Sequence, residues 1–323
     1  MHLQLFTYGK PIMSHQFETG FFVSQPAWHR LGIVLNNPPT IEEAIYASGL
    51  NWQVVEEPMY RLVEGQPKKV EGYKALVRDS DSSTLGVVTD YYQPLQNLEA
   101  FKFFDFLLHD GDATLETAGS LKSGKRVWVL AKLTQSPQEV QQGDAIAPYL
   151  LLHNAHDGSA AVWIQFCNIR VVCNNTLSMA ASSAREGEKF GKAIRIRHSS
   201  SVNEQLRIAK QVIDVAKRRF TQSIADYKVM AQKSISQEIF EHYIARSLNV
   251  SDPVNTRAYP HILQAFEAGR GNYGKTLWDA YNAVTEWIDH TRGRSEVSRL
   301  ESAWFGEGSR IKDCAYEQAL ALL

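Results

Sequence analysis

The stretch Leu115-Glu-Thr-Ala-Gly-Ser-Leu-Lys-Ser-Gly-Lys-Arg-Val-Trp-Val-Leu-Ala-Lys-Leu133 decides the fold class. Its two halves, Leu115 to Leu121 and Arg126 to Leu133, are rich in residues that favour extended structure. The polar, glycine-containing segment Lys122-Ser-Gly-Lys125 separates them and favours a turn. The pattern therefore predicts a β-hairpin.

The same signals recur along the first half of the chain. Tyr73 to Arg78 and Thr84 to Thr89 form a second predicted hairpin across Asp79-Ser-Asp-Ser-Ser83. Further predicted strands are Tyr149 to Asn154, Ala160 to Phe166 and Ile169 to Cys173. Between the hairpins, Asn97 is the predicted N-cap of a helix over Leu98 to His109, which Asp110-Gly111 ends. We expect a meandering antiparallel sheet with a helix laid on it.

The second half of the chain has helical periodicity. Apolar residues from Val202 to Ala231 recur at spacings of three and four, which predicts a long amphipathic helix. Further helices are predicted over Ile262 to Ala268, Thr276 to Asp289 and Ile311 to Leu322. The expected fold class is α+β: an antiparallel, hairpin-rich sheet with packed helices, followed by a helical C-terminal region. We divide the chain into a disordered extension (1–12), a β-rich α+β domain (13–200) and a helical region (201–323).

Composition and charge narrow the function classes. The chain has 323 residues, of which 44% are hydrophobic and 21% charged, so it can bury a large core and is not of the disordered class. The formal net charge of −1 conceals an asymmetry: Arg185 to Arg219 holds ten basic and four acidic residues, and the remainder has a net charge of −7. A local basic block suits a polyanion ligand. A solvated helix face is an equally good interpretation.

The cysteines and the hydropathy of the chain indicate the cellular compartment in which we expect the protein. The three cysteines, Cys167, Cys173 and Cys314, are odd in number and contain no CxxC pair, which argues against a disulfide framework and for a reducing, cytoplasmic setting. No apolar run approaches the roughly 18 residues that span a bilayer. We expect no membrane association.

Two motifs resemble a phosphate-binding loop and a metal site, but the residues around each of them argue against that function. Gly119-Ser-Leu-Lys-Ser-Gly-Lys-Arg126 nearly matches a phosphate-binding loop, but Arg126 replaces the magnesium-binding hydroxyl and a strand follows in place of a helix. His153 and His156 have HxxH spacing, but they lie at a strand end and no third ligand follows. We expect no cofactor or metal, and nothing in the chain argues for catalysis.

Arg170 and the polar residues after it form a candidate anion site. Ile169, Val171 and Val172 favour burial, so an arginine among them needs either a salt-bridge partner or a bound anion. Asn174, Asn175 and Thr176 are predicted to end the strand and to cap a helix that begins at Leu177. The N-terminus of such a helix could hold a phosphate.

Six segments spread along the chain have a recognisable pattern: Pro26-Ala-Trp-His-Arg-Leu-Gly32, Val88-Thr-Asp-Tyr-Tyr-Gln-Pro94, Asn97-Leu-Glu-Ala-Phe101, Asn168-Ile-Arg-Val-Val-Cys-Asn-Asn-Thr-Leu177, Ile196-Arg-His-Ser199 and Thr276-Leu-Trp-Asp-Ala-Tyr-Asn-Ala-Val-Thr-Glu-Trp-Ile-Asp-His290. With these segments the chain resembles the DUF932 family, in particular its "phage/plasmid-like protein" branch. The resemblance implies a mobile-element context, in which DNA replication, recombination and contests with host defence are common tasks.

Three functional hypotheses follow. The first is a DNA-binding protein, for single-stranded or double-stranded DNA, of the single-strand annealing type. It would be similar in broad plan to Rad52-like proteins and would form a homo-oligomer. Its candidate contacts are Lys122, Lys125, Arg126, Arg170, Asn175, Thr176, Lys189, Lys192, Arg195, Arg197 and His198. The second is a non-enzymatic effector or adaptor that acts on a host protein, and the third is an enzyme acting on a phosphorylated small molecule.

Overall fold

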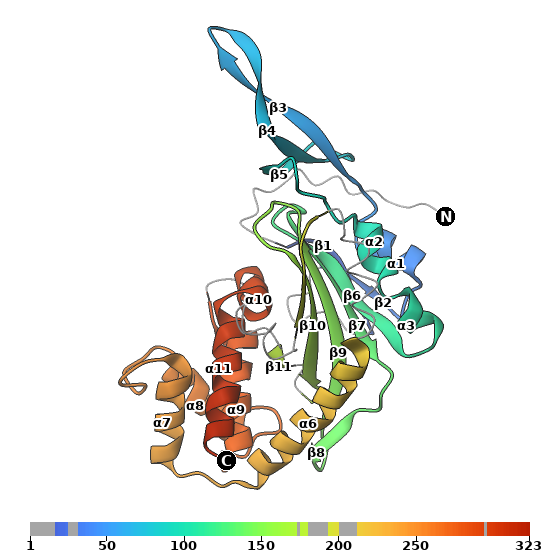
Figure 1. Ribbon diagram of the computed structural model, residues 1–323. Helices are drawn as coiled ribbons and strands as arrows, with labels where there is room; N and C mark the ends of the chain where they lie inside the picture. Colours follow the sequence, from blue (N-terminus) through green and yellow to red (C-terminus); the bar gives the residue numbers. More distant parts are fainter. Residues whose placement is uncertain (1–16, 25–31, 173–174, 180–192, 200–211, 294–295) are drawn as a thin grey trace, which may run out of the picture.

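A computed structural model describes residues 17–24, 32–172, 175–179, 193–199, 212–293 and 296–323. It has an α+β fold, as the sequence predicts. A nine-stranded sheet (sheet A) forms the centre, a three-stranded sheet (sheet B) projects from one end, and helices from the C-terminal part pack beside sheet A (Figure 1).

Sheet A has the strand order β11-β10-β9-β7-β6-β1-β2, with β12 also paired to β10 and β8 to β9. All pairs are antiparallel except β1–β2, which is parallel. The strands are β1 (Phe17–Val23), β2 (Ile33–Leu35), β6 (Ala113–Leu121), β7 (Arg126–Leu133), β8 (Gln138–Gln141), β9 (Asp144–Ala155), β10 (Val162–Arg170), β11 (Asn175–Met179) and β12 (Ala193–Ile196).

The β6–β7 hairpin confirms the prediction made from Leu115 to Leu133. Its turn places Lys122, Ser123 and Gly124 in the left-handed region, so this segment is a hairpin turn and no phosphate-binding loop. Gly119 lies within β6, where a Cβ would approach the ring of Trp128 to 2.6 Å and the Thr19 carbonyl oxygen to 2.3 Å. A glycine at this position therefore makes room for the Trp128 indole.

The strand predicted over Ile169 to Cys173 is wrong as a separate element. Ile169 and Arg170 are the last residues of β10, which runs on from Val162 without a turn. The pairing of β10 with β9 extends to Arg170 and Ile146, so the ladder carries the strand past the point at which composition suggests a break.

The two faces of sheet A pack differently. One face joins the large core, which also contains residues of α1 (Ile41–Ala47), α2 (Asn97–Lys102), α3 (Asp105–His109) and α6 (Val212–Gln232). The opposite face carries a smaller cluster, on which Trp304 and Phe305 of α10 (Glu296–Phe305) pack. The members of that smaller cluster are Leu121, Trp128, Leu130, Ala147, Tyr149, Leu151 and Cys167. We call this second face the α10 face.

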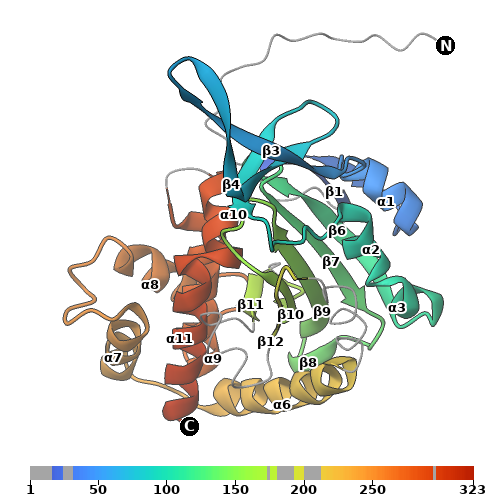
Figure 2. The same ribbon diagram turned by 45° about the horizontal axis from the view of Figure 1, so that its top comes forward.

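Sheet B consists of β3 (Val54–Val63), β4 (Gln66–Arg78) and β5 (Thr84–Thr89). Its β4–β5 pairing confirms the second predicted hairpin. β3 and the first half of β4, which the sequence did not predict, form a long arm that projects away from the body (Figures 1 and 2). Since β5 pairs only with Tyr73 to Val77, the outer part of the arm has two strands and no third.

The helix predicted over Leu98 to His109 is split into α2 and α3, and its N-cap is Gln96 instead of Asn97. Asn97 does not cap because its side chain is buried and used elsewhere. Its Nδ2 donates to the carbonyl oxygens of Leu50 and Trp52, and its Oδ1 bonds His156 Nε2 at 2.9 Å.

The C-terminal helices are α6, α7 (Gln237–Leu248), α8 (Tyr259–Ala268), α9 (Leu277–Glu286) with a π-helical turn (Trp287–Thr291), α10 and α11 (Glu307–Ala321). α8, α9 and α11 match predicted helices, whereas α7 and α10 were not predicted. The long predicted helix is α6 from Val212 onward, and its earlier part, like residues 1–12 and the domain boundary at 200, lies outside the described residues. In the part of the chain that the structure describes, no helix has the length and apolar content to cross a bilayer.

Candidate nucleic-acid interface

Several predicted contact residues meet at the end of sheet A from which the arm projects. We call this region the basic end and define it as Lys122, Lys125, Arg126, Arg195, Arg197 and His198, with Tyr91 and Tyr92 beside them. The β6–β7 turn, the last residues of β9 and the loops after β5 and β12 build it. The register of the strands explains how these distant segments come together.

Arg195 and Arg197 are exposed, and neither has an ion-pair partner among the described residues. Ile196 between them is fully buried and anchors the strand in the main core. Arg195 lies opposite Trp163 of β10, which lies opposite His153 of β9 and, through it, Trp128 of β7. Residues directly opposite in an antiparallel ladder share a face, so Arg195 belongs to the α10 face.

The β6–β7 turn contributes three cations, two of which are partly neutralised. Lys122 forms an ion pair with Glu301 of α10, and Arg126 Nη1 lies 3.8 Å from the same carboxylate. The Arg126 guanidinium also stacks over the Phe305 ring, 5.6 Å from its centroid. Lys125 has no carboxylate partner in the described ranges. One carboxylate for three cations leaves the turn positively charged.

A tyrosine–histidine stack joins the turn to β12. The rings of Tyr92 and His198 are stacked with centroids 4.3 Å apart, and Tyr92 Oη donates to the Ala155 carbonyl oxygen at 2.9 Å. Ala155 is the register partner of Arg126. Burial lowers the pKa of His198, although its hydrogen bond to the Gln93 carbonyl oxygen opposes this, and burial raises the pKa of Tyr92. His198 therefore contributes hydrogen bonding and stacking, with little charge at neutral pH.

Tyr91, next to this stack, is 90% exposed. Trp278 and Tyr281, in contrast, are fully buried in the core and are closed to a stacking ligand. Tyr91 therefore gives the basic end an exposed ring on which a base could stack.

Arg170 lies at the far end of β10, where it has no exposed surface. Its Nε and Nη2 donate to the two carboxylate oxygens of Asp144 at 2.7 and 2.6 Å, and Nη1 donates to Asn272 Oδ1 at 2.8 Å. Nη2 also donates to the Gly271 carbonyl oxygen. The structure thus has the buried salt bridge that the sequence left open, and we remove Arg170 from the candidate contacts.

The helix predicted from Leu177 is wrong. Asn175 to Met179 form strand β11, which pairs with β10 through Arg170↔Asn175 and Ile169↔Thr176. No helix N-terminus is present there to hold a phosphate, so this reason for including Asn175 and Thr176 is lost. Lys189 and Lys192 lie outside the described residues.

His153 and His156 are buried in separate hydrogen-bond networks. His153 Nε2 lies 3.1 Å from Gln165 Nε2, whereas His156 bonds Asn97 and Asn154. Burial lowers the pKa of each to about 3, so both are neutral near pH 7. Burial also raises the pKa of the Cys167 thiol to about 12. Cys173 lies outside the described part of the chain.

Sequence reasoning missed the α10 side of the site. Glu301 and Phe305 lie more than 170 residues from the turn that they contact, and no spacing rule connects them. The Tyr92–His198 stack was missed for the same reason.

A comparison with models of protein families matches residues 84–304 to the family described as "Domain of unknown function (DUF932)". The chain belongs to the DUF932 family. The match begins at β5 and ends within α10, so it includes the whole basic end, whereas β3 and β4 of the arm precede it. No curated protein and no solved structure matched the chain.

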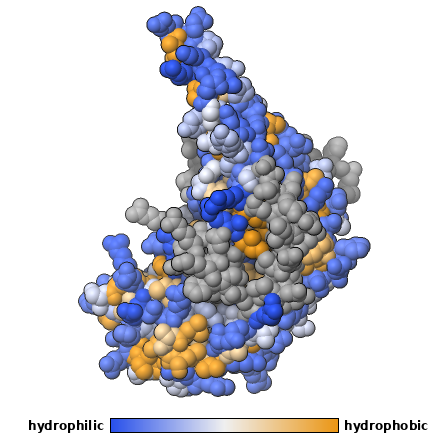
Figure 3. Space-filling view, in the orientation of Figure 1, coloured by the Kyte–Doolittle hydropathy of each residue, from blue (hydrophilic) through white to orange (hydrophobic). Residues whose placement is uncertain are grey.

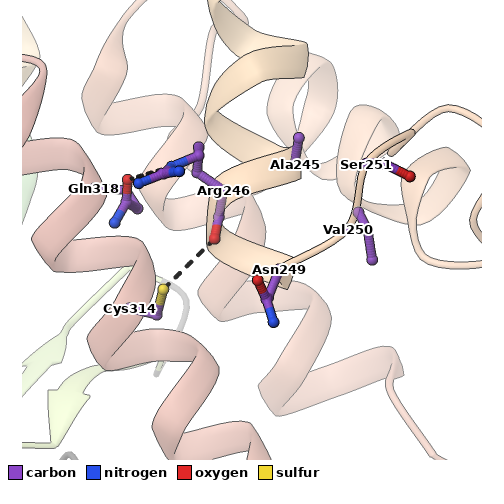
Figure 4. Close-up of a pocket in the computed structure, with 7 residues that line it drawn as sticks. All are labelled: Ala245, Arg246, Asn249, Val250, Ser251, Cys314 and Gln318. Carbon is purple, nitrogen blue, oxygen red and sulfur yellow. Dashed lines mark hydrogen bonds between the residues drawn. The ribbon is translucent and has the colours of Figure 1, made fainter.

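This DUF932 protein has a hollow of about 480 Å³ between the C-terminus of α7 and α11 (Figure 4). Cys314 lies in it, with its Sγ 3.6 Å from the Arg246 carbonyl oxygen, and Arg246 Nε donates to Gln318 Oε1 at 3.3 Å. Burial raises the pKa of the Cys314 thiol. The hollow is built from the helical C-terminal region and contains none of the predicted contact residues.

Proposed function

We propose that this DUF932 protein binds nucleic acid across the basic end and serves a phage or plasmid in single-strand annealing or recombination. The observation that supports this most directly is the pair Arg195 and Arg197, two exposed guanidinium groups without a carboxylate partner in the described ranges. Unpaired cations two positions apart, on an edge strand and directly after it, are suited to consecutive phosphates.

The basic end offers both parts of a single-strand site. Cations follow the phosphate backbone, and an exposed ring such as Tyr91 stacks on a base, which contributes about 1–3 kcal/mol for each base. Neither kind of contact reads sequence. We therefore propose binding that tolerates any sequence and weakens steeply with salt.

The Rad52-like plan and the homo-oligomer remain part of this proposal. A hairpin-rich sheet with the long helix α6 packed on it supports the analogy, as does the sequence resemblance to the phage/plasmid branch. The fold alone carries no function, so the site residues must be tested directly.

The test is fluorescence anisotropy with a labelled oligo-dT at low and moderate salt. The variant Arg195→Glu/Arg197→Glu should lose at least ten-fold in affinity, with a salt slope reduced by about 2, since each lost phosphate contact removes about 0.7 to 0.9 from the slope. The matched control is Lys228→Glu/Arg257→Glu, two exposed cations on α6 and in the α7–α8 loop, elements that lie away from the arm (Figure 1).

Wild-type protein that binds no oligonucleotide at low salt contradicts the proposal. Equal losses in the charge-reversal variant and its control would also contradict it, because binding would then depend on net charge alone. In either case the effector hypothesis takes its place, and host proteins captured by the wild type become the next ligands to examine.

A further inference from the structure

The outer part of the arm exposes two large side chains on one face. We call this part the distal ribbon and define it as Tyr60–Val63 paired with Gln66–Lys69. Tyr60 is 60% exposed and Leu62 is 78% exposed, and both lie on the face that also holds Pro67 and Lys69. Isolated two-stranded hairpins are only marginally stable in water. A ribbon of this kind gains order when it is bound.

The distal ribbon carries three cations, and the turn at its tip carries one acid, Glu64. Arg61 lies directly opposite Lys68 in the ladder, and neither has an ion-pair partner in the described part of the chain. Like charges directly opposite each other destabilise a strand pair. Lys69 has Glu71 at 3.4 Å, but both side chains are more than half exposed and solvent screens the pair. An anion between Arg61 and Lys68 would relieve their repulsion.

The shape of the distal ribbon fits a nucleic-acid groove. The major groove of B-DNA is wide enough for a two-stranded β-ribbon and about 8.5 Å deep. Four residues of strand extend about 13 Å at 3.3 Å each, which is enough to reach its floor. On the side of the arm that Figure 3 shows, the surface is largely hydrophilic with small apolar spots.

The arm begins beside the basic end. At its base, Arg78 Nη2 donates to the Ser123 carbonyl oxygen of the β6–β7 turn at 2.6 Å, and its guanidinium stacks over Trp52. Farther out, the four residues Val70 to Tyr73 lie opposite Met59 alone, and Gly72 has a φ of +81°. A bulge of this kind bends and twists a ribbon, so the distal ribbon is set at an angle to its base.

We infer that the distal ribbon is a duplex-DNA contact that enters the major groove, with Arg61, Lys68 and Lys69 on the phosphates at its walls. This rests on the proposed function, since it assigns the double-stranded part of the same ligand. Cations occur on both faces of the ribbon, as a groove with phosphates on two sides requires. The core of a protein–protein interface, in contrast, is depleted in lysine.

The experiment compares a labelled 30-bp duplex with oligo-dT on the full chain. The variant Arg61→Ala/Lys68→Ala/Lys69→Ala should lower duplex affinity at least ten-fold, with a salt slope smaller by about 2 to 3, and should leave oligo-dT affinity within two-fold. The matched control, Lys102→Ala/Lys228→Ala/Arg257→Ala, removes the same charge from exposed positions outside the arm and should change neither. Circular dichroism and the melting temperature confirm that each variant is folded.

Three outcomes would overturn the inference. Unchanged duplex affinity in the arm variant is one, and an equal loss of duplex and oligo-dT affinity is another. The third is a drop in molecular mass by sedimentation when Tyr60 and Leu62 are replaced by alanine, because the ribbon would then join copies of the chain. Failure of the proposed function looks different: wild-type protein would bind neither DNA, or Arg195→Glu/Arg197→Glu would leave oligo-dT binding unchanged.

Discussion

Arg170 is fully buried at the end of β10, a position that would be costly for an unpaired cation. Asp144 takes both ends of a bidentate pair and also accepts a hydrogen bond from Trp278 Nε1 at 2.7 Å. Asn272 and Gly271, from the loop between α8 and α9, complete the shell. The Arg170 side chain thus connects the helical C-terminal region to the end of strand β10.

Removal of the Asp144 carboxylate should therefore destabilise the fold more than the small buried area of this side chain suggests. Asp144→Ala leaves a buried guanidinium without its counter-charge, and the free energy of unfolding should fall by about 3–5 kcal/mol. Urea denaturation followed by tryptophan fluorescence measures this. The control Glu71→Ala breaks the exposed pair with Lys69 and should cost less than about 1 kcal/mol. An Asp144→Ala protein as stable as the control would contradict this account.

The buried histidines make stability depend on pH in a defined direction. His153 and His156 have pKa values of about 3 in the folded chain, below the ordinary value of 6.5. The unfolded chain therefore binds the additional protons. The contribution of the two neutral histidines to the free energy of unfolding is complete above pH 6.5 and is lost as the pH falls toward 3.

We expect the free energy of unfolding to decrease below pH 6.5 by up to about 1.4 kcal/mol per pH unit for each histidine. Denaturation at a series of pH values gives the slope. His156→Gln should reduce the slope of the free energy of unfolding against pH, even if the variant is less stable overall. The slope depends only on the difference in bound protons between the folded and unfolded chains. A slope identical to that of the wild type would exclude His156 as its source.

For single residues, the sequence narrows the possible roles of a side chain but does not decide between them. The pattern around Arg170 leaves a salt bridge and an anion site equally open, because its partner Asp144 lies 26 residues earlier and follows a glycine turn without any motif. The burial of His153 was likewise unreadable, since strand periodicity does not show which face a helix will later cover.

At the scale of elements, turns were predicted better than strand partners. The polar clusters at 79–83 and 122–125 marked both hairpins correctly, because turn chemistry is local. Asn174-Asn-Thr176 has the same local chemistry as a helix cap, but the chain there pairs with β10, and the ladder outweighs the capping preference. β3 was missed because Glu56, Glu57 and Pro58 break the alternation of a half-buried strand, as an arm in water allows.

Helix α10 acts on the basic end through Glu301. Glu301→Gln should free the Lys122 and Arg126 charges, raise the affinity for oligo-dT several-fold and steepen the salt slope by about 1 to 2. Anisotropy at four salt concentrations measures both quantities. Glu267→Gln, an exposed acid on α8, changes the net charge equally and should have little effect. If both variants gain affinity to the same extent, Glu301 has no specific role at the turn.

At the scale of the molecule, local stability should decrease from sheet A toward the tip of the arm. β9 is buried along almost its whole length, whereas the distal ribbon has water on both faces. Backbone amides of Tyr60 to Lys69 should exchange with solvent orders of magnitude faster than those of β9. Hydrogen exchange resolved by mass spectrometry tests this on the free protein. Comparable protection in the arm and in β9 would mean that the arm is covered in solution.

The charge asymmetry of the chain can be predicted from the sequence, but the place of these cations in the folded molecule cannot. The +6 block of Arg185 to Arg219 includes Arg195 and Arg197, which are exposed in the structure. Much of the block lies outside the described residues. The neighbouring turn at Lys122 to Arg126 joins Arg195 only through strand register across β7, β9, β10 and β12, and long-range pairing of this kind has no signature in a single sequence.

The composite edge of sheet A has a consequence for protein engineering. β11 and β12 lie end to end along β10, so that Met179 pairs with Cys167 and Ala193 with Gln165. Met179 and Ala193 are therefore held about two residues apart along β10 by the ladder itself. For a flexible peptide spliced in between these two positions, the loop-closure entropy grows by only about 0.6 kcal/mol for each doubling of its length. A fluorescent reporter or an affinity tag placed there would follow the protein in living cells and leave the described pairs of β11 and β12 with β10 in place.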